Sequence, residues 1–303
     1  MTFPTPLLHA RPLGSLRIHA IQAGGQRLDG GAMFGVVPKV LWQRKIESDE
    51  RNRIQMGMRC LLIEHSDGLV LIDTGAGNKE EQKFIDIYGM ELQADVPEQR
   101  ADETALEAGI RSAGFTPEDV KVVINTHLHF DHAGGNTRRN ADGNVVPTFP
   151  NASYVVQAGE YEWATNTNER TSASYFPANF EPLKASGQLH LIESDVEIVK
   201  GITARKTPGH VPHHQSLLID GGSDRALFLG DVMPTVNHVP LPWIMGYDVE
   251  PLRTLESKRA LLRDAAAEQW LLIFEHDAFQ SWGRVTSITI RRLARSCMPA
   301  PAP

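Results

Sequence analysis

Four side chains that can donate nitrogen or oxygen to a metal lie within six consecutive positions of the chain. They are His127, His129, Asp131 and His132, in the stretch THLHFDHAGG. The apolar run at 120–124, VKVVI, precedes this stretch and predicts a strand that ends beside the first histidine. In extended backbone, residues i and i+2 point to the same side, so the first two histidines can reach one metal ion together. The aspartate and the last histidine then turn toward a neighbouring ion, and Gly134 and Gly135 permit a sharp bend without bulk near the metals.

Three downstream positions have the right character to complete two metal sites. His210 follows the turn TPG, Asp231 follows LFLG, and His276 follows WLLIFE. Each comes at the end of an apolar, strand-like run, and rigid strand ends are where a preorganised site is best built. Each of the three alone would more often be structural, so they carry weight only together with the upstream cluster. Imidazole and carboxylate ligands suit zinc, with manganese, iron or cobalt as alternatives, so we predict two divalent ions.

Short apolar runs bounded by Gly, Asp, Asn or Pro recur along the chain and predict the strands that position these groups. They comprise residues 16–22, 59–65, 69–73, 120–125, 153–157, 189–193, 202–206, 216–220, 226–229 and 270–274. Helices are predicted at 103–113, 158–165, 251–268 and near 287–295. Strands followed by helices, twice over and without a linker, favour one α/β domain over 1–303, with sheets sandwiched between helical layers.

Two stretches, 22–58 and 230–248, lack clear periodicity but are too apolar for disorder. Long irregular segments in a compact domain are usually functional, so we expect them to be pocket loops, although packed Ω-loops are an alternative. The large apolar side chains that we expect to line a substrate pocket are Met33, Phe34, Trp42, Met233 and Trp243.

Bulk composition limits the partners. The formal charge is -7, from 30 Lys+Arg against 37 Asp+Glu, and no basic run suggests a nucleic-acid surface. A neutral, partly apolar small substrate is easier to accommodate than a polyanion. The N-terminus lacks the apolar core of a signal peptide, and no apolar run approaches the roughly 20 residues of a membrane span, so we expect a cytoplasmic protein. Cys60 and Cys297 are expected to be free thiols rather than a disulfide framework.

The order of these ligands resembles that of the metallo-β-lactamase superfamily. Asp73 in the stretch LIDTG also matches, at the position where the family has an aspartate that supports the histidine loop. The resemblance covers residues 59 to 277 and implies a four-layer αβ/βα sandwich with a dinuclear site between the edges of two sheets. It also implies the ligand sets: His127, His129 and His210 for the first metal, Asp131, His132 and His276 for the second, and Asp231 bridging the two.

Two closely spaced metals lower the pKa of a shared water, which gives a bridging hydroxide nucleophile near neutral pH. Asp131 is the natural proton shuttle between this hydroxide and a leaving group. Residues 31–39, 230–235 and 242–248 look like the N-acyl-homoserine lactonase branch, whose members quench quorum sensing. We therefore predict a lactonase that opens N-acyl-homoserine lactones or related lactones. An organophosphate, aryl ester or thioester hydrolase of the same fold is the alternative, and a redox or binding protein using iron is a third.

One departure from the lactonase pattern concerns the substrate donor. Some lactonases have a tyrosine three residues after the bridging aspartate, and this chain has Pro234 there. Tyr247 or His238 could supply a donor from the same loop, or could only pack. His213 and His214 lack ligand spacing and are expected to support the ligands or lie at the surface. Because relatives are often dimers, 22–58 is a candidate homodimer interface by resemblance.

Overall fold

A computed structural model describes residues 8–92, 103–140, 142–286 and 289–292 and contains two seven-stranded sheets within those ranges. The first sheet has the strand order β1 (Leu8–Leu13), β2 (Leu16–Asp29), β3 (Arg53–Glu64), β4 (Leu69–Ile72), β5 (Val120–Ile124), β8 (Ser153–Gln157) and β9 (Leu189–Ile192). The second has the order β10 (Val196–Val199), β11 (Ile202–Lys206), β12 (Gln215–Asp220), β13 (Arg225–Phe228), β14 (Leu271–Ile273), β15 (Trp282–Thr286) and β16 (Thr289–Arg292). A short hairpin, β6 (Thr137–Arg139) with β7 (Val145–Pro147), stands apart from both.

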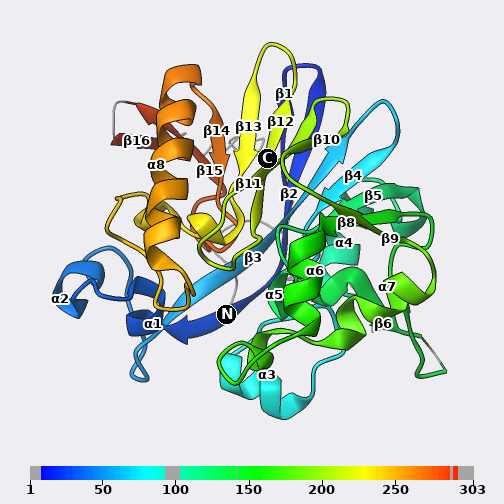
Figure 1. Ribbon diagram of the computed structural model, residues 1–303, viewed down its shortest axis with the longest axis horizontal. Helices are drawn as coiled ribbons and strands as arrows, with labels where there is room; N and C mark the ends of the chain where they lie inside the picture. Colours follow the sequence, from blue (N-terminus) through cyan, green and yellow to red (C-terminus); the bar gives the residue numbers. More distant parts are fainter. Residues whose placement is uncertain (1–7, 93–102, 141, 287–288, 293–303) are drawn as a thin grey trace, which may run out of the picture.

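The helices of the described residues include α1 (Gly30–Phe34), α2 (Lys39–Trp42), α3 (Gln82–Tyr88), α4 (Ala105–Ser112), α5 (Phe130–Ala133), α6 (Ala158–Thr165), α7 (Glu181–Ala185) and α8 (Pro251–Glu268). The predicted helices at 158–165 and 251–268 have these same bounds, and the one at 103–113 is confirmed as α4. The long helix α8 runs beside β14 and β15, as Figure 1 shows in orange. None of the described helices combines the length and the apolar character that crossing a membrane requires.

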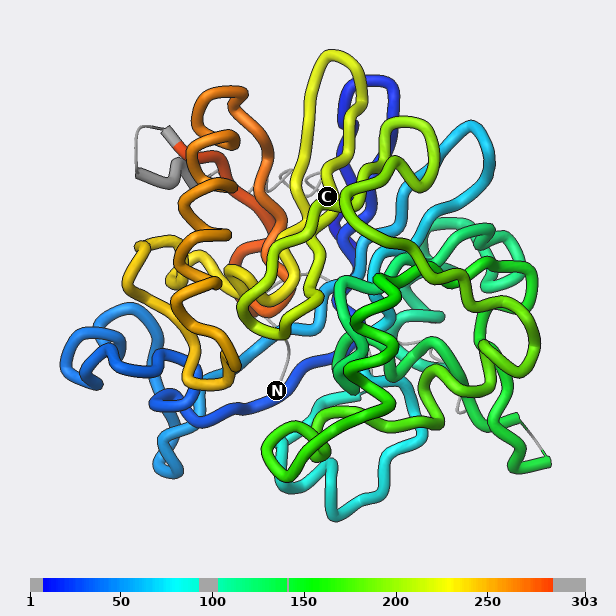
Figure 2. The backbone as a smooth tube through the Cα atoms, viewed as in Figure 1, coloured from blue at the N-terminus to red at the C-terminus, as the bar shows by residue number. Residues whose placement is uncertain are grey.

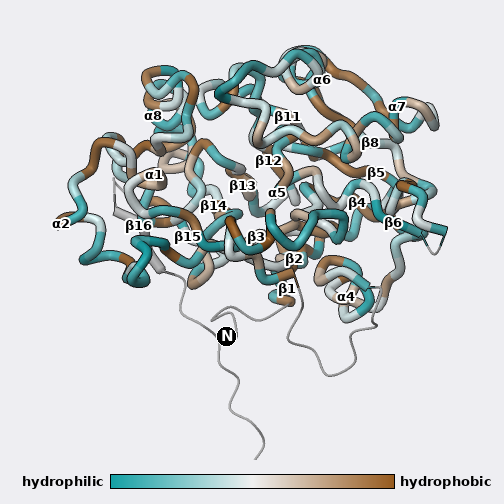
Figure 3. Tube along the Cα trace, turned by 90° about the horizontal axis from the view of Figure 1, so that it is seen from below, coloured by the Kyte–Doolittle hydropathy of each residue, from teal (hydrophilic) through white to brown (hydrophobic). Residues whose placement is uncertain are grey.

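The main core lies between the two sheets. Residues such as Ile63, Ile72 and Ile124 of the first sheet pack in one buried cluster with Ile219 and Phe228 of the second. A second cluster joins the outer face of the first sheet to α4, and a third joins the outer face of the second sheet to α8. Figure 3 shows α4 and α8 on opposite sides of the strands. This is the helix–sheet–sheet–helix sandwich that the sequence predicted.

Strand direction decides where a functional site can form. Strands β4, β5, β8 and β9 run parallel to one another, as do β13 and β14, so within each set the carboxyl ends meet at one edge. Strand β11 is antiparallel to β12, which is antiparallel to β13, so β11 ends at that edge too. The loops that carry all seven predicted ligands follow β5, β11, β13 and β14.

Two sequence-based expectations are corrected. The segment near 287–295 was predicted to be helical, but its described part is the strand β16, which pairs with β15. The segment 22–58 was expected to be irregular throughout, but β2 continues to Asp29 and β3 begins at Arg53. A register shift between Gln22 and Gly25 interrupts the pairing, and Gly24 has a φ of 110° there, so the glycine pair marks a bulge rather than the end of a strand.

What remains irregular in the first stretch is residues 30–52, which hold only α1 and α2. These two short helices project at one end of the molecule, and the tube in Figure 2 shows this segment in blue beside the lower end of α8. The second stretch, 230–248, is irregular as predicted, with two short 3-10 turns. Cys60 is buried in β3 with a free thiol, whereas Cys297 lies outside the described residues.

Candidate metal centre

The ligand-rich segment begins where β5 ends and is fixed by an aspartate from the neighbouring strand end. Asp73 follows β4 and adopts a φ of 53°, which directs its buried carboxylate at residue 126. The two oxygens accept hydrogen bonds from the Thr126 backbone N–H and hydroxyl, both at 2.7 Å. Its Oδ2 also lies 3.1 Å from Nδ1 of His132. Asp73 therefore supports the histidine loop, as the resemblance to the metallo-β-lactamase superfamily implied.

The two glycines after the histidines are required for close packing rather than for an unusual backbone angle. A Cβ on Gly134 would lie 2.2 Å from the Ala76 carbonyl oxygen, and one on Gly135 would lie 2.2 Å from that of Thr74. Lys79 donates to the carbonyl oxygens of Gly134 and Thr137, which ties the same loop down from outside. The segment after β5 is therefore held from both sides, and its side chains are preorganised.

Three histidines from two loops converge on one point. Nε2 of His127 lies 2.9 Å from Nδ1 of His129, and Nε2 of His210 lies 3.2 Å from the same nitrogen. One ligand atom from each of these residues lies within 4.8 Å of the others. Nitrogens that point at one another at such distances are the arrangement that a single cation between them would occupy.

A second group forms beside the first. Asp131, His132 and His276 also place their ligand atoms within 4.8 Å of one another, and Nε2 of His276 lies 3.1 Å from Nε2 of His132. Asp231 contacts both groups: its Oδ2 is 3.1 Å from Nε2 of His210, and its Oδ1 is 3.0 Å from Nε2 of His276. The structure thus brings all seven sequence-predicted ligands together, with one carboxylate between two clusters.

The residues fit a pair of divalent cations by their chemistry. Burial and the neighbouring imidazoles hold the pKa of His127 and His129 well below the usual value, so both are neutral ligands. Although burial opposes it, Asp231 raises the pKa of His276 to about 9, because buried carboxylates attract positive charge to this point. Oδ1 of Asp231 is buried and lies 3.0 Å from Nε2 of His276, without the alignment of a hydrogen bond. A buried carboxylate oxygen that faces imidazole nitrogens in this way is suited to a metal ion.

Each of three histidines is oriented by a partner on its far nitrogen. Nδ1 of His210 lies 2.9 Å from Oδ1 of Asp248, and Nδ1 of His276 lies 2.7 Å from the Gly57 carbonyl oxygen. Nδ1 of His132 contacts two carboxylates, because it lies 2.9 Å from Oε1 of Glu275 as well as 3.1 Å from Oδ2 of Asp73. Contacts of this kind fix the ring and leave the other nitrogen for the metal.

Sequence reasoning missed several of these supporting residues. Gln26 donates to Oδ2 of Asp131 at 2.5 Å, from the part of β2 that was expected to be irregular. Glu160 accepts from the Leu128 backbone N–H at 3.0 Å and from the Tyr175 hydroxyl at 2.9 Å. Burial raises the pKa of Glu160 to about 7. Single Gln, Glu and Asp residues far from the motif carry no local spacing signal, so only the fold reveals them.

The two histidines that flank the His210 turn have different surroundings. His214 is fully buried, and its Nε2 accepts a hydrogen bond from the Asp231 backbone N–H at 3.0 Å. Its Nδ1 must then carry the proton and donate to the Thr207 hydroxyl at 2.8 Å. His214 therefore positions the backbone of Asp231, whereas His213 lies partly buried against Gly159, away from this contact.

The apolar residues predicted to line a pocket are mostly enclosed. Met33, Phe34 and Trp42 are at most 1% exposed and pack in one cluster, and Met233 is buried in the cluster beneath α8. Side chains without exposed surface do not face a solvent-filled cleft, so the predicted wall is reduced to Trp243, which is partly exposed. Its ring packs edge-on against Phe34 at 5.5 Å.

The two predicted substrate donors also differ. Nε2 of His238 lies 2.8 Å from the Met33 carbonyl oxygen, so it must donate, and Nδ1 then accepts from the Thr235 hydroxyl at 2.8 Å. Both nitrogens are used inside the protein, and the ring stacks on Phe34 at 4.8 Å. Tyr247 is 41% exposed, so its side chain is the accessible one of the two.

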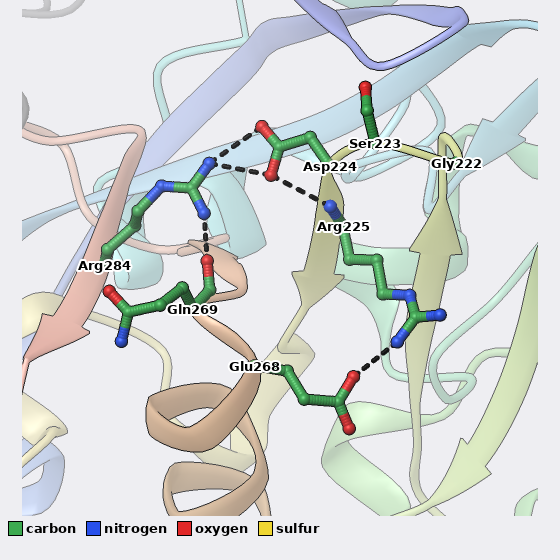
Figure 4. Close-up of a pocket in the computed structure, with 7 residues that line it drawn as sticks. All are labelled: Gly222, Ser223, Asp224, Arg225, Glu268, Gln269 and Arg284. Carbon is green, nitrogen blue, oxygen red and sulfur yellow. Dashed lines mark hydrogen bonds and ion pairs between the residues drawn. The ribbon is translucent and has the colours of Figure 1, made fainter.

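One surface depression shares none of the seven predicted metal ligands. It has a cavity volume of about 410 Å³ and is lined by Gly222, Ser223, Asp224, Arg225, Glu268, Gln269 and Arg284. Figure 4 shows that its charged groups satisfy one another: Arg284 bonds both oxygens of Asp224 at 2.8 Å, and Arg225 pairs with Glu268. Because these surface charges form ion pairs with one another, they are not available to a ligand.

Comparison with known proteins supports the family. Residues 59–276 match the family described as the metallo-beta-lactamase superfamily. An N-acyl homoserine lactonase of Bacillus sp. is 31% identical over 235 residues, which cover 74% of this chain and 82% of the relative. A Staphylococcus aureus structure described as a "probable metal-dependent hydrolase" has a TM-score of 0.84 at 29% identity, and the match covers 95% of this chain and 100% of that one.

A further structure, AidC, described as a dizinc quorum-quenching lactonase in complex with a product, has a TM-score of 0.75. It is 20% identical, and the match covers 96% of this chain and 98% of that one, so it supports the fold alone.

Proposed function

The chain belongs to the metallo-β-lactamase superfamily as a hydrolase, and from that premise we propose that it is a dinuclear lactonase that opens N-acyl-homoserine lactones or related lactones. The observation that carries the proposal is the position of Asp231, whose two oxygens reach histidines of both ligand groups. A carboxylate in that position suits two ions held close together. The relatives that are 29% to 31% identical and named lactonases favour a lactone as the substrate.

The proposed ligands divide as the geometry groups them. His127, His129 and His210 would hold one ion, Asp131, His132 and His276 would hold the other, and Asp231 would contact both. Zinc is the expected metal for this donor set, with manganese, iron or cobalt as alternatives. When bound, two such ions supply a hydroxide at neutral pH and polarise the substrate carbonyl.

The chain's own residues handle the proton. Ring opening joins a water oxygen to the carbonyl carbon and breaks the bond between that carbon and the ring oxygen. The ring oxygen leaves as an alkoxide and needs a proton, which the water supplies. We assign this transfer to Asp131. Its Oδ1 lies 3.8 Å from Nε2 of His132, and its Oδ2 lies 3.7 Å from Nε2 of His276. Gln26 donates a hydrogen bond to Oδ2 and so fixes the carboxylate between the two rings. The acid product releases one proton to solution at neutral pH.

Tyr247 is the residue that we propose as a donor to the substrate in place of a tyrosine at Pro234. It precedes Asp248, which bonds His210, so its backbone is fixed beside the first ligand group. Burial, Tyr88, Asp29 and Asp131 raise the pKa of Tyr247 to about 12, so the phenol keeps its proton at neutral pH and can donate. His238 cannot serve without breaking a bond to Met33 or Thr235.

A substrate panel tests the proposal. Zinc-, manganese- and cobalt-loaded protein is assayed by proton release on N-acyl-homoserine lactones with short, medium and long acyl chains, and on a phosphotriester, an aryl ester and a thioester. We expect the largest kcat/KM on a lactone. No lactone turnover by metal-loaded protein would overturn the proposal, and phosphotriester turnover far above lactone turnover would favour the alternative hydrolase. The homodimer and the cytoplasmic location stay predictions.

A further inference from the structure

The five tyrosines of the chain fall into two groups by what their hydroxyls do. Three hydroxyls donate within the protein: that of Tyr154 to the Asn136 carbonyl oxygen at 3.0 Å, that of Tyr161 to Glu181 at 2.7 Å, and that of Tyr175 to Glu160 at 2.9 Å. The hydroxyls of Tyr88 and Tyr247 have no hydrogen-bond partner among the residues that the structure describes. The hydroxyls of Tyr88 and Tyr247 are therefore both available to a ligand.

Tyr88 is held against the ligand segment by aromatic packing. It is the last residue of α3, and its ring centroid lies 5.0 Å from that of Phe130 and 4.5 Å from that of Phe84. Phe130 stands between the ligands His129 and Asp131 at the start of α5. Burial and the nearby Asp131 carboxylate raise the pKa of Tyr88, so this phenol also keeps its proton and can donate.

Tyr247 comes from another part of the chain and is held near the first ligand group. It lies in the irregular segment 230–248, one residue before the carboxylate that bonds His210. Burial and the charges of Tyr88, Asp29 and Asp131 raise the pKa of Tyr247 to about 12, so its phenol keeps its proton at neutral pH. One hydroxyl is therefore fixed beside the second ligand group through Phe130, and the other is fixed beside the first ligand group through Asp248.

Tyr88 is also the polar end of an aromatic surface. The Phe84 ring packs edge-on against Phe130 at 4.9 Å and against Phe176 at 5.2 Å, and Tyr88, Phe84 and Phe176 are only partly buried. This cluster, and not the enclosed one around Phe34, offers accessible apolar surface next to Asp131. A phenol beside such a surface suits a substrate whose apolar chain is joined to its reacting ring through a polar group.

We propose that Tyr88 is a specificity-determining residue that donates a hydrogen bond to the amide joining the acyl chain to the lactone ring, while the chain lies along the partly exposed rings of Phe84 and Phe176. Tyr247 then serves the lactone carbonyl from the other side. This inference rests on the proposed lactonase function and adds to it a preference for lactones that carry an amide.

The test compares Tyr88→Phe with a matched control, Tyr161→Phe, whose lost hydroxyl donates to Glu181 and accepts from Lys184 within the protein. Each is assayed on an N-acyl-homoserine lactone and on an alkyl lactone of equal chain length without the amide. Losing one hydrogen bond to the substrate should lower kcat/KM of the Tyr88→Phe variant about tenfold on the amide-bearing lactone and leave the alkyl lactone within about twofold. The control should keep wild-type rates on both.

Two further measurements separate the outcomes. Affinity for the ring-opened N-acyl-homoserine, measured by calorimetry, should fall in the Tyr88→Phe variant while its metal content stays at the wild-type level. Unchanged product affinity and unchanged rates, or equal losses on both lactones, would overturn the inference while leaving the lactonase proposal intact. No turnover of either lactone by the metal-loaded wild type would overturn the lactonase proposal and this inference with it.

Discussion

Asp248 orients His210: its Oδ1 lies 2.9 Å from Nδ1 of the imidazole, and the Thr254 hydroxyl donates to its Oδ2 at 2.6 Å. Asp248 ends the irregular segment 230–248, and Thr254 lies in the first turns of α8. The loop that carries Tyr247 is thus anchored at the same carboxylate that orients a proposed metal ligand, His210. Loop position and ligand position are coupled through one residue.

Replacing Asp248 with Asn should weaken metal binding. The amide keeps the shape of the side chain but removes the negative charge that makes His210 a better ligand. We expect zinc affinity, measured by competition with a chromogenic chelator, to fall about 10- to 100-fold. Glu250→Gln is the matched control, because the Glu250 carboxylate accepts hydrogen bonds from the exposed Arg253 side chain and contacts no predicted ligand among the described residues. Equal affinities in the Asp248→Asn variant and the wild type would show that the carboxylate does not support the ligand.

Replacing Asp131 with Ala should abolish most of the hydrolysis. The change removes both a proposed ligand of the second ion and the proposed proton shuttle. We expect kcat to fall by about 10²- to 10⁴-fold, the usual contribution of a positioned acid–base group. Metal content, measured by elemental analysis on the same sample, separates a lost ion from a lost proton transfer. Normal rates would contradict the mechanism.

The motif at 126–135 could be predicted because its information is local. Side chains with donor atoms follow an apolar run at 126–135, and the three later candidates each follow a run of the same kind. Their assignment as ligands also needed the resemblance to a known family, because each alone is an ordinary residue at the end of a strand. The supporting residues could not be predicted. Gln26 and Glu275 gain their roles from strands that only the folded sheets bring beside Asp131 and His132.

Errors in the secondary structure have a similar origin. The first strand was predicted to end at residue 22, just before the pair Gly24–Gly25. In the structure a bulge accommodates these glycines, and pairing of β2 with β3 resumes at Gly25. The segment at 289–292 becomes a strand because it pairs with β15, a tertiary interaction that outweighs a weak local preference. The same limit applies to Phe34 and Trp42, since their sequence does not tell whether a large apolar side chain lines a pocket or fills a core.

The burial of His238 predicts a loss of stability in acid. Burial, above all, lowers the pKa of His238 to about 4, whereas the unfolded value is 6.5. The unfolded chain therefore binds a proton between these values and the folded protein does not, so stability falls as pH drops from 6.5 to 4. The full effect is about 3 kcal/mol at about 1.4 kcal/mol per pH unit.

His238→Gln removes the titrating group and retains a donor for the Met33 carbonyl oxygen. Chemical unfolding of both proteins at several pH values should give a free-energy difference that changes between pH 6.5 and 4 with this sign. Measuring a difference between the two proteins cancels the titration of the other histidines. If the free-energy difference does not vary between pH 6.5 and 4, His238 binds its proton at the same pH in the folded and unfolded states, and its pKa is not lowered by folding.

Lys258 should be essential to the stability of the loop that carries Trp243. Its side chain is fully buried in α8, and its Nζ donates to three carbonyl oxygens, those of Pro240 at 2.9 Å, Leu241 at 3.2 Å and Trp243 at 2.7 Å. Three donors thus satisfy three acceptors that point into the protein.

Lys258→Met fills the same space without any donor, and each acceptor left without one costs about 1–3 kcal/mol. We expect a clear fall in Tm and faster hydrogen exchange at 240–248, whereas Arg259→Met on the exposed face of the same helix should leave both unchanged. If the Lys258→Met variant melts at the wild-type temperature, the loop is held by the packing of Trp243 on Phe34 instead.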